Sequence, residues 1–196
     1  MTTKIVLAGI WMLGSTGVFC ASENMPTTVD WKAALPLVQL AVRHEFPKVV
    51  AQAHYAASIA STVDIAGSGV PMALVDLGTG GYTEEMTVMR MEGTTPVVAR
   101  FRGKDDKTAP MVFLSGVSQD KGESLELIPH DHMVFSGHWV VNGAKLKKCG
   151  GEAYQWDETA KNFEFEKKLT KSMTKEFCQK VEAKLGGSGP SLPSHE

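Results

Sequence analysis

Three histidines are the residues whose type and spacing most suggest chemistry in this sequence of 196 residues. His130, His132 and His138 fall within one short segment, and imidazole with a nearby methionine is a suitable ligand set for copper or zinc. His130 and His132 are close enough to share an ion. On an extended strand His138 lies about 20 Å from His132, unless a turn at Ser136-Gly137 folds it back. The alternative is two loop histidines and one strand histidine packed beside its neighbours.

Two serines are candidate nucleophiles, because each follows a predicted strand. Ser115 stands in Leu-Ser-Gly and Ser136 in Phe-Ser-Gly. Neither has the Gly-x-Ser-x-Gly pattern, and neither is followed by a predicted helix, so the strand-to-helix elbow of hydrolases is missing. A hydrolase is therefore the third functional hypothesis, after binding and metal capture.

The segment Asp64-Ile65-Ala66-Gly67-Ser68-Gly69-Val70-Pro71 lies between two apolar strands. It resembles a degenerate strand–DxDxDG–strand unit of FG-GAP and VCBS-type repeats, in which acidic loop side chains bind calcium and hairpins build propeller blades. Ala66 and Ser68 stand where that family has carboxylates, and calcium prefers six to eight oxygen ligands. We therefore expect Asp64 to cap its own tight turn.

Residues 1–22 have the layout of a secretory signal peptide. Lys4 precedes the apolar residues 5–13, a Gly-Ser-Thr-Gly break follows, and small residues stand before predicted cleavage after Cys20 or Ser22. The alternatives are an uncleaved anchor, for which the apolar run is shorter than about 20 residues, and a lipoprotein carrying lipid on Cys20. The sequence thus predicts an exported protein, periplasmic or secreted, with no stable membrane span after cleavage.

Cys149 and Cys178 are the cysteines that remain after cleavage. An even pair in an oxidising compartment predicts a disulfide, whose loop would stabilise the fold by roughly 3 kcal/mol. Two buried free thiols are the alternative. A cysteine metal site is disfavoured, because neither residue has a second cysteine two to four positions away.

The composition is that of a folded protein, with 43% hydrophobic residues, 21% charged residues and a net charge of −2. This near-neutral balance, with scattered lysine and arginine, argues against nucleic acid as a partner. Residues 1–22 form the predicted signal, residues 23–186 a single domain, and residues 187–196 a Gly/Ser/Pro tail expected to be disordered.

The fold class follows from hydrophobic periodicity. Apolar residues spaced for a helix occur at 30–45, and a clear amphipathic pattern at 169–185 predicts a second helix, with Thr170 as N-cap. Between them, short alternating segments are separated by turns, of which Asn142-Gly143 is the strongest hairpin signal. We expect an α+β fold: a mainly antiparallel meander or curled sheet of about seven to nine strands, with an N-terminal helix and a C-terminal amphipathic helix.

Residues 75–81, 96–101 and 149–156, together with Phe177-Cys178, resemble small uncharacterised exported bacterial proteins. The resemblance implies no activity, and it supports a bridge between Cys149 and Cys178. Most of the aromatic residues on the predicted strands are expected to form the core, but Trp156 and Phe165 would form a binding patch if they shared an exposed face. The aromatic residues concerned are Tyr82, Phe101, Trp139, Tyr154, Trp156, Phe163 and Phe165.

The functional expectation is a non-enzymatic exported domain that binds or scaffolds an envelope protein or a glycan, without a cofactor. The alternative is a copper- or zinc-binding exported protein that uses His130, His132 and His138. An envelope hydrolase is the third hypothesis.

Overall fold

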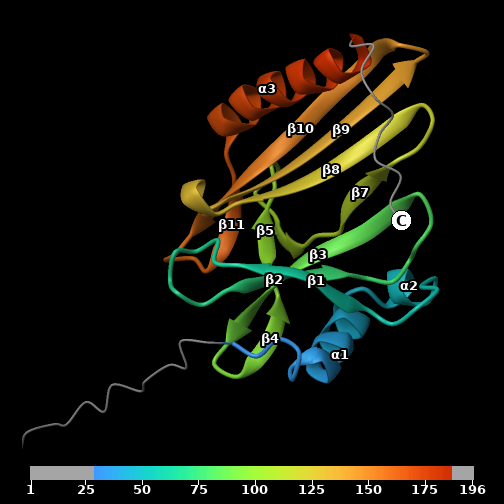
Figure 1. Cartoon of the computed structure of the whole chain (residues 1–196). Helices are drawn as coiled ribbons and strands as arrows, with labels where there is room; N and C mark the ends of the chain where they lie inside the picture. The colour runs from blue at the N-terminus through green and yellow to red at the C-terminus, as the bar shows by residue number, and fades with distance from the viewer. Residues whose placement is uncertain (1–28, 187–196) are drawn as a thin grey trace, which may run out of the picture.

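A computed structural model describes residues 29–186 as one mostly antiparallel, curled sheet with helices packed on it (Figure 1). The predicted signal peptide and tail lie outside the described residues. The helices are α1 (Leu35–Glu45), α2 (Pro47–Val50), the 3-10 helix η1 (Pro129–Asp131) and α3 (Lys167–Gly186). The strands are β1 (Ser58–Val63), β2 (Met72–Asp76), β3 (Thr83–Glu92), β4 (Thr95–Val98), β5 (Arg100–Arg102), β6 (Thr108–Pro110), β7 (Phe113–Val117), β8 (Lys121–Ile128), β9 (Met133–Asn142), β10 (Lys145–Asp157) and β11 (Asn162–Phe165). The α+β prediction is confirmed.

The strands follow the order β1-β2-β3-β7-β8-β9-β10-β11-β5-β6, and β4 pairs with β3 off this path. Among the described pairs only β11 and β5 run parallel. A single residue, Ala99, separates β4 from β5, and its N–H donates to the carbonyl oxygen of Val88 on β3 at 2.8 Å. The β4–β5 segment therefore links the β3 and β11 regions of the sheet, which curls the sheet around an interior.

The interior of the curl is aromatic. Phe101 stacks on Phe163 with ring centroids 4.8 Å apart, and Phe113 and Tyr154 meet Phe101 edge to face. Strand alternation explains this placement, because Tyr154 and Trp156 on β10 share the inner face while Ala153 lies on the outer one. Trp156 and Phe165 are half-buried against this core. Tyr82 is an aromatic residue outside the core, because it is 84% exposed in the loop before β3.

Helix α1 covers the β1–β4 end of the sheet, where Val38 and Val42 pack against apolar residues of β2 and β3. It is shorter than the predicted 30–45. Asp30 accepts a hydrogen bond from the N–H of Ala33 at 2.9 Å and caps a turn that leads into the helix. Phe46 ends the helix before Pro47, as expected from the restriction that proline places on its preceding residue.

Helix α3 packs across the outer face of β9 and β10 (Figure 1). Phe177 and Val181 are its buried residues, and the ring of Phe177 lies directly over Gly137, where a Cβ atom would come within 2.6 Å of Cζ. The helix begins at Lys167, so Thr170 is not its N-cap. Instead, the Thr170 hydroxyl accepts a hydrogen bond from the N–H of Ala153 on β10 at 2.9 Å.

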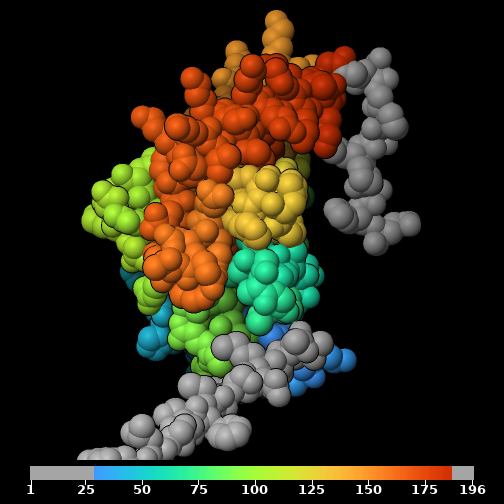
Figure 2. All heavy atoms as spheres, turned by 90° about the vertical axis from the view of Figure 1, so that its left-hand side faces the viewer, coloured from blue at the N-terminus to red at the C-terminus, as the bar shows by residue number. Residues whose placement is uncertain are grey.

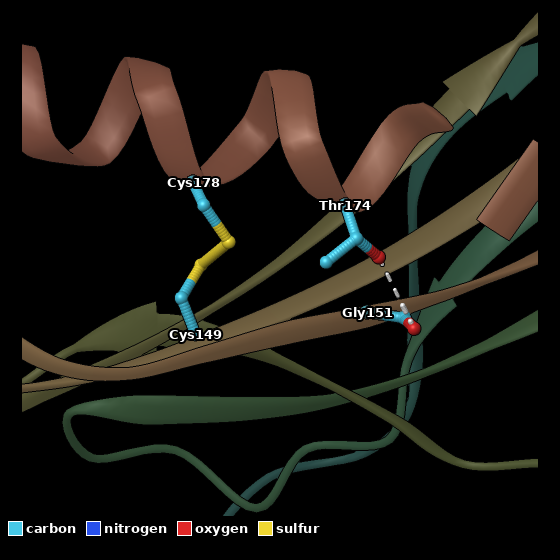
Figure 3. The surroundings of a disulfide bond; sticks show 4 residues. All are labelled: Cys149, Gly151, Thr174 and Cys178. Atoms are coloured by element: carbon cyan, nitrogen blue, oxygen red, sulfur yellow. Dashed lines mark hydrogen bonds between the residues drawn. A yellow bond between two sulfur atoms is a disulfide. The ribbon is translucent and has the colours of Figure 1, made fainter. Parts of the chain in front are cut away.

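The predicted disulfide between Cys149 and Cys178 is confirmed (Figure 3). It joins β10 to α3, and the two cysteines are 29 positions apart in the sequence. One helical turn away, the Thr174 hydroxyl donates to the carbonyl oxygen of Gly151. Covalent and hydrogen-bonded contacts thus fix α3 to the outer face of the sheet.

Strand β10 is a long strand that runs unbroken from residue 145 to residue 157. Gly150 and Gly151 continue the ladder by pairing with His138 and Gly137 of β9. The long β9–β10 hairpin turns at Asn142-Gly143, as predicted, with Gly143 at φ +57°. This ladder presents one face to α3 and leaves the other to the interior of the curl.

Candidate functional site: a polar cavity on the inner sheet face

A cavity of about 200 Å³ lies on the inner face of the sheet, opposite α3. Residues 111–114 form its apolar side, and Leu114 is exposed at 37%. Its polar side comes from β8, β9 and β10. The polar lining residues are Glu123, Ser136, His138, Glu152 and Tyr154. This volume corresponds to about seven water molecules in the liquid, which suits a small molecule or one side chain.

Glu152 accepts two side-chain hydrogen bonds at the cavity. Its Oε2 accepts a hydrogen bond from the Tyr154 hydroxyl at 2.6 Å, and its Oε1 accepts one from Lys104 Nζ at 2.7 Å. Lys104 also lies 5.0 Å from the centre of the Phe165 ring, a cation–π geometry. The carboxylate is therefore neutralised and fixed in position from two directions.

This hydrogen-bond network shifts the pKa values of Glu152 and Tyr154 in opposite directions. Burial raises the pKa of Glu152, but the hydrogen bonds from Lys104 and Tyr154 and the nearby charges outweigh burial, and the net pKa is below its ordinary value. Burial, and then the hydrogen bond to Glu152, raises the pKa of Tyr154 far above its ordinary value. Glu152 is thus held as a carboxylate and Tyr154 as a neutral phenol.

The imidazole ring of His138, which extends from β9, lies over Gly150 of the neighbouring strand β10. A Cβ atom at Gly150 would fall 2.8 Å from Cε1 and 2.9 Å from Nε2 of the imidazole, so only glycine leaves room for the ring there. Glu123 is directly opposite His138 on β8, and directly opposite residues of an antiparallel pair have Cβ atoms about 5 Å apart. Imidazole and carboxylate therefore form one polar end of the cavity.

The three histidines of the metal hypothesis have different surroundings. His130 is exposed beside Asp131, with 3.1 Å between Nε2 and the carboxylate. His132 adopts φ +52°, and its Nδ1 lies 2.7 Å from the carbonyl oxygen of Ile65. His138 alone lines the cavity. Residues 29–186 contain no group of three His, Cys, Asp or Glu side chains placed to hold a metal, so this geometry gives the hypothesis no support.

His132 instead joins η1 to the loop at residues 64–71. Figure 2 shows the two segments, one yellow and one blue-green, against each other on the same side of the molecule. Within the loop, Asp64 accepts hydrogen bonds from the N–H groups of Ser68 and Gly69 at 3.2 and 2.8 Å. The expectation that Asp64 caps its own turn is confirmed.

The two candidate nucleophiles, Ser115 and Ser136, lie in different parts of the sheet. Ser136 lines the cavity beside His138, whereas Ser115 pairs with Glu84 at the β3–β7 junction. Neither strand turns into a helix at its serine, as the sequence indicated. Ser136 therefore contributes a hydroxyl to the cavity wall without the backbone elbow of a hydrolase.

A second, larger cavity of about 330 Å³ lies between α1 and the β3–β4 hairpin. Its arginines are paired with its glutamates, Arg90 with Glu92 and Arg100 with Glu45. Because these charges cancel within the wall, the inner-face cavity is the stronger candidate for a binding site.

Sequence reasoning identified His138 and Ser136 but missed the carboxylates of the cavity. One signal was present: Glu123 precedes Leu125 and Leu127 at a spacing of two, which puts a charge on an otherwise apolar strand face. No local pattern connects Lys104 to Glu152, because their contact depends on the curl of the sheet.

None of the described helices is long and apolar enough to cross a membrane. Comparison with protein-family models, curated proteins and solved structures gives no match.

Proposed function

We propose that this protein is an exported, non-enzymatic binding domain of the cell envelope, and that the inner-face cavity is its binding site. The observation that carries the proposal is the cavity itself, in which hydrogen-bonded polar groups face the apolar residues 111–114. Binding sites combine apolar lining with a few positioned polar groups in this way.

The titration behaviour of the cavity favours binding over proton-transfer catalysis. A general acid or base works best when its pKa is near the working pH. The pKa of Glu152 is lowered and that of Tyr154 is raised, so both groups keep one protonation state near neutral pH. They are suited to hold a ligand through fixed hydrogen bonds and charge.

Two features support export. The first is the signal-like pattern of residues 1–22, and the second is the disulfide between Cys149 and Cys178, since such bonds persist in oxidising compartments. The full chain expressed in a bacterium should be recovered from the envelope or medium without its first 20 or 22 residues. Intact-mass measurement checks this, and an uncleaved product in the cytoplasm would contradict it.

Binding is tested with three small probes of different chemistry: n-butylamine, n-butyrate and N-acetylglucosamine. Titration into ¹⁵N-labelled protein with an intact disulfide should give saturable amide shifts for at least one probe, centred on residues 136–138 and 150–154. The cavity-filling variant Ser136→Leu should abolish these shifts. The matched variant Ser172→Leu, on the exposed side of α3, should keep them. Absence of saturable shifts with all three probes would refute the proposal.

A further inference from the structure

The two carboxylates of the inner-face cavity differ in their partners. Lys104 neutralises Glu152 at 2.7 Å. Glu123 is a half-buried carboxylate on the same wall, and the ion pairs of residues 29–186 do not include it. Removing part of a carboxylate from water without a counter-ion is unfavourable, so the cavity is suited to a ligand that brings a positive charge.

The surroundings of Glu123 offer further acceptors for a cation that carries N–H groups. Ser136 presents a hydroxyl, and an imidazole of His138 in its neutral form presents one ring nitrogen as an acceptor. An ammonium group has three donors and no acceptor. Carboxylate, hydroxyl and imidazole on two adjacent strands thus offer acceptors to an ammonium group.

The opposite wall of the cavity is apolar. Residues 111–114 include Met111, Val112, Phe113 and Leu114. A short alkyl chain attached to the ammonium would remove part of this apolar surface from water, which favours binding. The small volume of about 200 Å³ limits the occupant to a short chain.

We infer that the inner-face cavity binds a primary alkylammonium group, with Glu123 as its counter-ion. The group is either a free amine or the side chain of a lysine on a partner. The inference rests on the proposed binding function and specifies the ligand chemistry of that site. Lys121 lies two residues from Glu123 on β8, opposite Val140, and it is exposed. Its charge would oppose a bound ammonium.

The test is a titration of the ¹⁵N-labelled protein with n-butylammonium. Binding is measured from the amide shifts of residues 122–124, 136–138 and 150–154. We expect saturable binding that n-butanol and n-butyrate do not reproduce. Glu123→Gln should weaken it about tenfold, because a charge-assisted bond is replaced by a neutral one. Lys121→Gln should tighten it. The matched control is Glu126→Gln, which removes the same charge from the outer face of the same strand, opposite Phe135, and should leave the affinity unchanged.

A peptide pair then identifies the source of the ammonium. Acetyl-Gly-Lys-Gly-amide is compared with its norleucine analogue, which keeps the alkyl chain and lacks the charge. Tighter binding of the lysine peptide than of n-butylammonium supports a partner protein, whereas binding of n-butylammonium alone supports a free amine. Thermal unfolding of each variant shows that the fold is kept.

Three results would overturn the inference. If n-butylammonium gives no saturable shifts while n-butyrate or N-acetylglucosamine does, the ligand chemistry is wrong and the binding function stands. If none of the probes binds, the inference and the proposed function both fail. An affinity for n-butylammonium that Glu123→Gln leaves unchanged would also refute the role of that carboxylate.

Discussion

Lys104 and Glu152 are 48 positions apart in the sequence, and the Nζ of one lies 2.7 Å from Oε1 of the other. The contact connects the loop after β5 to the middle of β10. It holds a carboxylate on the inner face of the sheet, beside the Tyr154 hydroxyl. It is also the principal attraction that lowers the pKa of Glu152.

The first prediction concerns acid stability. Because the folded pKa of Glu152 is below its ordinary value of 4.5, its contribution to stability is complete above that value and is lost as pH falls through the folded pKa. Glu152→Gln should lower the free energy of unfolding near neutral pH, by up to about 1 kcal/mol for this partly exposed group. Urea unfolding at several pH values should show the difference shrinking in acid. A difference that is constant with pH, or that Glu182→Gln on α3 reproduces, would contradict this assignment.

The second prediction concerns the disulfide. Replacing Cys149 and Cys178 together by serine should lower the free energy of unfolding by about 3 kcal/mol, because the unfolded chain regains the freedom of the loop between them. Urea denaturation measures the loss. A reducing agent should shift the midpoint of the unmodified protein and leave that of the double variant in place. An unchanged midpoint for the unmodified protein would show that the bond adds no stability.

The third prediction separates two neighbouring histidines. His132→Leu removes the partner of the Ile65 carbonyl oxygen and should cost about 1 kcal/mol, with faster amide exchange at residues 64–71. His130→Leu is the control, since this exposed ring pairs with the adjacent Asp131 and not with the loop, and the change should alter stability by less than about 0.5 kcal/mol. Equal effects of both substitutions on exchange in the loop would rule out the bridging role of His132.

The fourth prediction concerns the packing of α3. Gly137→Ala puts a methyl group within 2.6 Å of the Phe177 ring and should destabilise the fold by about 1–3 kcal/mol. In a Phe177→Ala background the same substitution should cost much less, because the obstructing ring is gone. A double-mutant cycle from urea unfolding measures this coupling. Additive effects would mean that the strain arises elsewhere.

The elements of this protein were largely predictable because their signals are local. Apolar spacing identified both long helices, and Asn142-Gly143 located the central hairpin. Boundaries were less accurate where a tertiary contact decides them. Thr170 is a good N-cap residue by type, yet its hydroxyl bonds to Ala153 on another element, and α3 starts at Lys167.

The candidate site was only partly predictable, because its members come from strands whose registers are set by long-range pairing. His132 and His138 look equivalent in the sequence. In the fold, His132 is hydrogen-bonded to the Ile65 carbonyl oxygen, while the ring of His138 lies over Gly150 in the cavity. The signal-like pattern at the N-terminus, the two long helices and the cysteine pair are recognised from composition and spacing alone, because their signals are local. The meeting of Lys104 with Glu152, and of Glu123 with His138, was decided only by the tertiary structure, because curling and strand register bring distant segments together.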